Sequence, residues 1–292
     1  MIKNKLILGT VQFGLNYGIN NSVGKPSTEN IKAILNLAFN NGIELLDTAE
    51  AYGNSQERIG EYHQNSTHKF QVITKFSSVV KGLSLNIKER VFQNIKTLQI
   101  DSLYGYMFHS FSDFENYYPS FEKELISLKK DGVITKIGVS LYSNEEFEKV
   151  LEYENISLVQ LPFNLLDNEI KRNKILSKAK NKGIEIHTRS AFLQGLFFKQ
   201  ANDLNKNLKP LSSPINKLQN LCSEDYKIND LALNYVYSQK NISKVLIGVD
   251  TIEQLKSNLE SINKSISKEQ LKVINTINIK ETDLLNPSNW NL

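Results

Sequence analysis

The sequence predicts an α/β protein in which eight parallel strands close into a (β/α)₈ barrel, also called a TIM barrel. Short β-branched or apolar runs recur eight times, and segments with apolar residues at helical spacing separate them. A length of 292 residues suits eight such units in one domain spanning residues 1–292. An open doubly wound sheet is the structural alternative, but no G-x-G-x-x-G sequence supports it.

Each predicted strand is a short apolar run that gives way to polar residues. The eight runs are Lys5–Thr10, Ile43–Thr48, Phe70–Lys75, Ser102–His109, Thr135–Ser140, Ile156–Leu161, Ile184–Thr188 and Lys244–Gly248. Strict alternation of these runs with helices implies that the strands are parallel, because a crossover helix returns the chain to the same end of the sheet.

Start and stop signals frame the predicted helices. Ser27 and Thr28 are N-cap candidates for the first long helix, and Asn41 with Gly42 ends it. Gly132 and Gly183 similarly end later helices. One connection is irregular: residues 189–227 contain Pro210 and Pro214 and predict a loop with short helical pieces. After the last strand come helix Ile252–Ile262, a second helix Lys268–Ile277, and a tail with the single tryptophan, Trp290. That ring is predicted either to fix the tail to the barrel or to cover the mouth of the barrel.

The composition is that of a globular protein that buries a full core. Hydrophobic residues make up 40% of the chain, charged residues make up 23%, and the net charge is +4. No basic run interleaved with aromatics is present, so neither nucleic acid nor a membrane surface is an expected partner. Cys222 is the only cysteine and no signal peptide is recognisable, which predicts a cytoplasmic protein. No metal site is expected, and the oligomeric state is not predicted.

Four polar residues follow strands whose carboxyl ends should meet at one face of the barrel: Asp47, Tyr52, Lys75 and His109. Taken singly, each is commonly a cap, a packing residue or a solvated side chain. Together they make chemical sense, because Lys75 would stabilise the Tyr52 phenolate and Asp47 would hold that ammonium in place. His109 would orient a substrate carbonyl. The set therefore predicts proton donation to a carbonyl oxygen while hydride arrives at carbon.

Ordered motifs along nearly the whole chain resemble the aldo-keto reductase family. The signature segments are LDTAEAYG at residues 46–53, ERIG at 57–60, LGT at 8–10, ITK at 73–75, IGVS at 137–140, NLLD at 164–167 and QGL at 194–196. The resemblance implies a barrel with a nicotinamide cofactor lying across its carboxyl end. It also implies that Asp47, Tyr52, Lys75 and His109 are the catalytic residues. The cofactor contacts that it implies are Thr10, Asp47, Ser140, Gln160, Arg189, Gln194, Gly195, Leu196, Gly248, Val249, Gln254 and Asn258.

The chain departs from the family pattern in three places. Leu141 stands where Asn usually follows Ser140, and Arg189 stands where many members place an aromatic ring beneath the nicotinamide. The Arg189 guanidinium would either stack there or reach for an anionic substrate. Val249 and Gln254 replace residues that hold the cofactor's 2′-phosphate. Family membership favours NADP as the cofactor, whereas these replacements favour weak discrimination and leave NAD as an alternative.

The substrate is predicted only as an aldehyde or ketone. The segments at residues 9–14 and 189–192 resemble a branch associated with bacterial surface-polysaccharide synthesis, which suggests carbohydrate metabolism and a sugar carbonyl, either free or nucleotide-linked. A cofactor-binding regulatory or scaffold protein with little turnover is one alternative. An aldolase in which Lys75 forms a Schiff base is another, and Asp47 argues against it because it would raise the pKa of Lys75.

Overall fold

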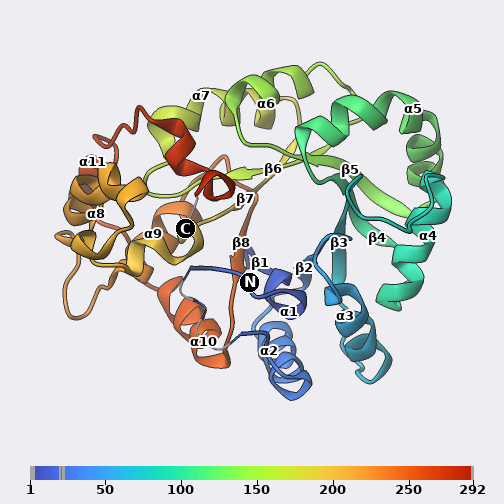
Figure 1. Cartoon of the computed structure of the whole chain (residues 1–292), viewed down its shortest axis with the longest axis horizontal. Coiled ribbons are helices and arrows are strands. Elements are labelled where there is room, and N and C mark those ends of the chain that lie inside the picture. Colours follow the sequence, from blue (N-terminus) through green and yellow to red (C-terminus); the bar gives the residue numbers. More distant parts are fainter. Residues whose placement is uncertain (1–3, 20, 22–23, 291–292) are drawn as a thin grey trace.

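Eight parallel strands form a closed barrel in the computed structural model, which describes residues 4–19, 21 and 24–290 (Figure 1). They follow chain order around the barrel: β1 (Leu6–Gly9), β2 (Leu45–Asp47), β3 (Gln71–Phe76), β4 (Leu103–Phe108), β5 (Ile134–Ser140), β6 (Leu158–Pro162), β7 (Glu185–Arg189) and β8 (Lys244–Gly248). The predicted fold class is thus confirmed, and each strand overlaps the run that predicted it. That residues 1–292 form one domain stays a prediction.

Helices surround the barrel, and Figure 1 shows α8, α9 and α11 together on the side of β7 and β8. The helices are α1 (Val11–Gly14), α2 (Thr28–Asn40), α3 (Ser55–Gln64), α4 (Ile87–Leu98), α5 (Phe111–Lys130), α6 (Asn144–Val150), α7 (Glu169–Asn181), α8 (Ser212–Gln219), α9 (Ile228–Tyr237), α10 (Ile252–Ser261) and α11 (Lys268–Ile274). Among the described residues, no helix is long and apolar enough to cross a membrane.

Local signals explain several boundaries. The Ser27 hydroxyl accepts a hydrogen bond from the backbone N–H of Asn30 and so caps α2, as its position predicts. Strand β7 extends to Arg189, one residue beyond the predicted run. The connection that follows contains three short 3₁₀ helices, Leu193–Phe198, Ala201–Asp203 and Lys206–Leu211, before α8. The predicted loop with helical pieces is therefore present.

Strand register brings the carboxyl ends of β1, β2 and β8 together. Gly9 pairs with Asp47 on one side and with Gly248 on the other, which closes the barrel. Below this level the barrel interior is filled by an apolar cluster of Ile7, Leu45, Ile73, Met107 and Leu158. A larger apolar core lies between the strands and the helices. Polar side chains are therefore held at one end of an otherwise apolar barrel.

Candidate active site

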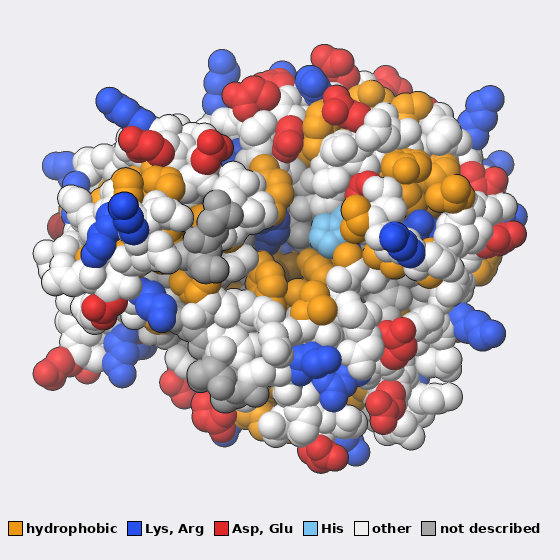
Figure 2. All heavy atoms as spheres, viewed as in Figure 1, with side chains coloured by type: hydrophobic (Ala, Val, Ile, Leu, Met, Phe, Trp, Pro, Cys, Tyr) orange, Lys and Arg blue, Asp and Glu red, His pale blue; other side chains and the backbone are white. Residues whose placement is uncertain are grey.

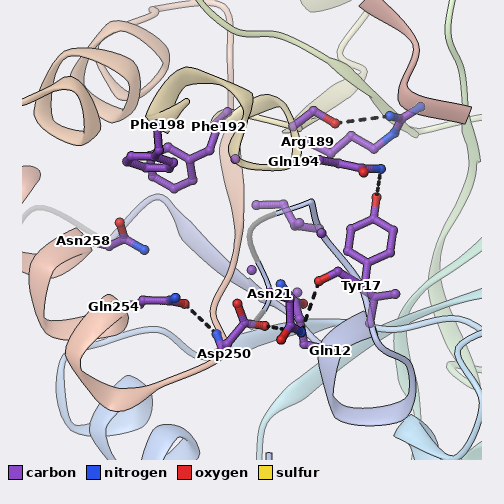
Figure 3. Close-up of a pocket in the computed structure, with 18 of the residues that line it drawn as sticks. Gln12, Tyr17, Asn21, Arg189, Phe192, Gln194, Phe198, Asp250, Gln254 and Asn258 are labelled. Atoms are coloured by element: carbon purple, nitrogen blue, oxygen red, sulfur yellow. Dashed lines mark hydrogen bonds between the residues drawn. The ribbon is translucent and has the colours of Figure 1, made fainter. Parts of the chain in front are cut away.

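A cavity of 670 Å³ opens at the carboxyl end of the strands. Figure 2 shows the corresponding hollow, with basic and histidine side chains visible inside it. Its wall includes Asp47, Tyr52, Gln160 and Arg189 at one end and Asp250, Gln254 and Asn258 at the other. The close-up in Figure 3 shows Arg189 and Asn258 on opposite sides of this pocket. The cavity is thus elongated across the barrel mouth, and its two ends differ in chemistry.

A buried ion pair lies at the first end. Lys75 Nζ is 2.5 Å from Asp47 Oδ1 and also donates to the carbonyl oxygen of Thr48 at 3.0 Å. The other carboxylate oxygen of Asp47 accepts a hydrogen bond from Gln160 Nε2 at 2.8 Å. Lys75 and Asp47 are only 1% and 2% exposed, so neither charge is solvated and each depends on the other.

Tyr52 lies in the turn after β2, close to this pair. The Lys75 ammonium is 5.3 Å from the centroid of the Tyr52 ring. The backbone of Gly14 in α1 passes so near this turn that a Cβ there would lie 1.8 Å from the Tyr52 carbonyl oxygen. Glycine is therefore required at residue 14 for α1 to pack against the turn that holds Tyr52.

A second buried ion pair, between Arg90 and Glu50, holds the same turn in place. Arg90 in α4 donates to Glu50 Oε2 through Nε at 2.9 Å and through Nη2 at 2.5 Å. Glu50 Oε1 accepts from Tyr106 Oη at 2.9 Å and from Asn94 Nδ2 at 2.8 Å. These bonds fix Glu50 two residues before Tyr52. Sequence reasoning did not assign Glu50 a role, although it lies inside the signature segment.

His109 follows β4, and its ring meets the Tyr52 ring edge-on at a centroid distance of 5.5 Å. Burial, together with the positive charges of Lys75 and Arg189, lowers the pKa of His109 to about 3. The imidazole is therefore neutral at neutral pH. Its Nδ1 atom is buried and has no hydrogen-bond partner among the described residues.

The Tyr52 pKa is shifted in the direction opposite to the one expected from the sequence. Burial raises it and the Asp47 carboxylate raises it further, while Arg189 opposes them. Lys75 does not lower it overall, because Asp47 lies 2.5 Å from the ammonium and offsets its charge. The phenol therefore keeps its proton at neutral pH.

The pKa of Lys75 also differs from the expectation. Burial lowers it by more than the Asp47 carboxylate raises it. A lowered pKa is one requirement of a Schiff-base lysine. However, Lys75 is not part of the described pocket wall, and its ammonium is bonded to Asp47 and Thr48. Its position, and not its pKa, therefore argues against the aldolase alternative.

Further predicted contact residues lie along the remaining wall. Gln194 and Gly195 have positive φ angles of 52° and 92°, and the Gln194 amide donates to Tyr17 Oη at 2.8 Å. Gly248 faces Gln12, and a Cβ on residue 248 would lie 2.4 Å from Gln12 Nε2. Gln254 Oε1 accepts the backbone N–H of Asp250 at 2.7 Å, as Figure 3 shows.

The pocket wall does not include four of the predicted contacts. Thr10, Ser140, Leu196 and Val249 are buried and are not among the described residues that line it. Thr10 instead donates its hydroxyl to the Asp47 carbonyl oxygen at 3.0 Å and so supports the end of β2. Whether these four residues contact a cofactor stays a prediction.

Several wall residues were missed by sequence reasoning, namely Tyr17, Asn21, Phe192, Phe198, Lys199, Asn229 and Ser257. All except Asn229 and Ser257 lie in the long connections after β1 and β7, where no periodic pattern marks a position. Asn229 lies at the start of α9, and Ser257 lies within α10. Nothing in the surrounding sequence distinguishes either from other polar helix residues. Within the described part of the chain, no cluster of His, Cys, Asp or Glu could hold a metal ion.

Comparisons with known proteins agree on one family. The model of the "Aldo/keto reductase family" matches residues 5–279. Among curated proteins, the chain is 28% identical to the aldo-keto reductase YhdN of Bacillus subtilis, over 87% of this chain and 83% of that protein. It is 25% identical to an NADH-specific methylglyoxal reductase of Escherichia coli, over 77% of this chain and 80% of that protein.

Solved structures share the same fold. The holo form of aldo-keto reductase AKR11C1 from Bacillus halodurans superposes with a TM-score of 0.75 and 18% identity, covering 95% of this chain and 94% of that one. A glycerol dehydrogenase from Gluconobacter oxydans gives a TM-score of 0.72 and 21% identity, covering 94% and 90%. These matches bear out the resemblance seen in the sequence.

Proposed function

The chain belongs to the aldo/keto reductase family and is an oxidoreductase, and on this premise we propose that it reduces an aldehyde or ketone to an alcohol. The observation that carries the proposal is the cluster at one end of the pocket, where Asp47 and Tyr52 line the wall and Lys75 and His109 lie against them. A proton donor and a neutral hydrogen-bonding ring beside a buried ion pair suit chemistry at a polarised carbonyl.

The pocket fits an extended nicotinamide dinucleotide. It is long, and Gln12 Oε1 is a buried acceptor without a partner among the described residues. Gly248 leaves space that a Cβ would fill. Asp47 and Gln160 would hold the nicotinamide end, with Arg189 beside it, whereas Gln254 and Asn258 would hold the adenosine end. When bound, this cofactor supplies the hydride.

Tyr52 is the proposed general acid. Its raised pKa keeps the phenol protonated, and the alkoxide that forms during reduction is a stronger base than phenolate, so the proton moves to the substrate oxygen. The positive charges of Lys75 and Arg189 lie near the phenolate that remains. Asp47 offsets the charge of Lys75, so Arg189 adds the net positive charge. Neutral His109 orients the carbonyl through a hydrogen bond and does not act as an acid itself.

Replacement of the Tyr52 hydroxyl tests this assignment. The Tyr52→Phe variant should lose roughly 10²–10⁴-fold in kcat, because only the proton donor is removed. Cofactor binding, measured by fluorescence titration, should persist. Tyr17→Phe is a matched control, since it removes another phenol from the same pocket and should lose far less turnover. Near wild-type turnover of Tyr52→Phe on a broad carbonyl panel would overturn the mechanism. A wild-type protein that binds cofactor and reduces nothing would favour a regulatory or scaffold role.

The expected preference between NADPH and NADH depends on the residues at the adenosine end of the pocket. Arg189 and Lys199 are the cationic residues among the described pocket wall, and neither lies on the loop after β8 or on α10. Asp250 instead places a carboxylate there. We propose that NADPH remains usable but is preferred over NADH by less than about a hundredfold, which corresponds to the loss of one charged hydrogen bond of about 1.5–3 kcal/mol. Titration with both reduced cofactors decides this, and a preference of many thousandfold would contradict it.

A sugar carbonyl remains the proposed substrate class, and a cytoplasmic location remains the proposed site of action. The first rests on the resemblance of residues 9–14 and 189–192 to a polysaccharide-related branch, and the second on the single cysteine, Cys222. A panel of free and nucleotide-linked keto sugars tests the substrate class. Reduction of simple aldehydes in strong preference to all of these would argue against it.

A further inference from the structure

The charges at the end of the pocket that includes Asp47, Tyr52 and Arg189 do not sum to zero. Asp47 and Lys75 neutralise each other at 2.5 Å, His109 is neutral and Tyr52 is protonated. Arg189 adds one positive charge to this group. Its positive charge acts to lower the pKa of each of three neighbouring side chains, Tyr52, Lys75 and His109. This end of the pocket therefore carries a net charge of +1.

No carboxylate of the described residues lies within ion-pair distance of the Arg189 guanidinium. Nη2 donates to the Leu141 carbonyl oxygen at 3.2 Å, and Nη1 makes a long contact of 3.5 Å with Ser190 Oγ. A guanidinium has five N–H donors, so these two bonds leave most of them available. By contrast, the buried arginines Arg90 and Arg172 each donate two N–H groups to one carboxylate, Arg90 to Glu50 and Arg172 to Asp167.

The guanidinium is also held in a fixed position. Its central carbon lies 4.1 Å from the centroid of the Tyr142 ring, and the bond to Leu141 ties it to the end of β5. In Figure 3 Arg189 lies beside the Gln194–Tyr17 pair, on the side of the pocket away from Asn258 and Gln254. A planar, immobilised guanidinium loses little entropy when it binds a planar anionic group, which favours carboxylate or phosphate recognition.

We propose that Arg189 recognises an anionic group of the substrate, so that the preferred substrates are carbonyl compounds carrying a carboxylate or phosphate near the reacting carbon. This inference rests on the proposed function and narrows its substrate class. The anionic group of the substrate would pair with the positive charge of Arg189, which no carboxylate of the described residues neutralises. A nucleotide-linked sugar, whose diphosphate is anionic, falls within the class.

Matched carbonyl pairs test the proposal. Butanal is compared with succinic semialdehyde for a carboxylate, and glyceraldehyde with glyceraldehyde 3-phosphate for a phosphate. The kcat/KM ratio of anionic to neutral partner should be at least about tenfold in one pair, which also identifies the anion. Arg189→Gln should bring that ratio close to one, whatever happens to the absolute rate, and most of the change should be in KM. Lys199→Gln is the control, because it removes the other described cation of the wall at a different place, and it should leave the ratio unaltered.

A second measurement does not depend on turnover. Butyrate and butyramide have nearly the same shape, and only butyrate is charged, so their binding to the protein saturated with NAD⁺ is compared by ligand-observed NMR. Butyrate should bind at least about tenfold more tightly, and Arg189→Gln should abolish the difference. Equal ratios in wild type and Arg189→Gln, or equal binding of the two ligands, would overturn the proposal. If no carbonyl is reduced at all, the proposed function fails, while the binding comparison still decides the role of Arg189.

Discussion

His109 should make the stability of this protein sensitive to mild acid. In the folded protein its pKa is about 3, compared with 6.5 for a free imidazole. At pH values well above 6.5, neither the folded nor the unfolded chain binds a proton at this residue. As the pH falls below 6.5, the unfolded chain takes up a proton that the folded protein refuses until the pH nears 3. The free energy of unfolding therefore decreases with pH across that window.

The size of this decrease in the free energy of unfolding follows from the shift in the His109 pKa. One pKa unit corresponds to about 1.4 kcal/mol, so at pH 5 the contribution of His109 is about 2 kcal/mol of lost stability relative to pH 8. His63 and His187 are also buried with lowered pKa values and add their own losses. The His109→Gln variant isolates the contribution of one residue, because glutamine keeps a polar side chain and does not titrate.

Urea denaturation at pH 8 and pH 5 provides the measurement. The decrease in unfolding free energy between the two pH values should be about 2 kcal/mol smaller in His109→Gln than in wild type. Comparing the two pH values within each protein cancels the direct cost of the substitution. An equal decrease in both proteins would show that His109 is not held neutral by Lys75, Arg189 and burial. The proposed role as a neutral hydrogen-bond donor would then fall with it.

Three further substitutions probe the surroundings of the site. Lys75→Met leaves Asp47 as an unpaired buried charge and should cost about 3–5 kcal/mol in urea denaturation, while adding Asp47→Asn should restore part of it. Glu50→Gln leaves Arg90 without its partner and should lower kcat more than it raises the KM for the carbonyl, because the Tyr52 turn loosens; an unchanged kcat would contradict this. Trp290→Ala removes a ring that packs on the core and donates to the Leu284 carbonyl oxygen, so the melting temperature should fall with KM unaltered; the reverse result would indicate a lid.

The barrel could be predicted from the sequence because each strand and helix carries its own signal. Apolar runs are bounded by turn residues, and Gly132 and Gly183 adopt the positive φ of 76° that helix ends favour. Strand order follows chain order, so alternation alone gave the topology. The closeness of Asp47 and Lys75 follows directly, since both lie at carboxyl ends of adjacent parallel strands.

The electrostatics and the outer pocket wall could not be predicted in the same way. The sequence places an ammonium near the Tyr52 phenol, but the sign of the pKa shift depends on how far burial and Asp47 outweigh it. Likewise, Tyr17 contacts Gln194 from 177 residues away through loops of irregular backbone. Neither the depth of a side chain nor the path of such a loop is encoded in a periodic pattern.

The polar groups at the barrel mouth fall into two kinds, and the difference has a functional meaning. Asp47, Lys75 and Gln160 satisfy one another within the protein, as do Glu50 and Arg90. Gln12 Oε1 lacks a hydrogen-bond partner among the described residues, and Arg189 lacks a described carboxylate, and both line the pocket. A buried acceptor without a partner, such as Gln12 Oε1, reduces stability, and the charge of the partly buried Arg189 is not neutralised by a described carboxylate. A ligand that supplies the missing bonds and charge is therefore stabilising. The internally satisfied groups set the geometry of the reaction, while the unsatisfied ones are left to select what binds.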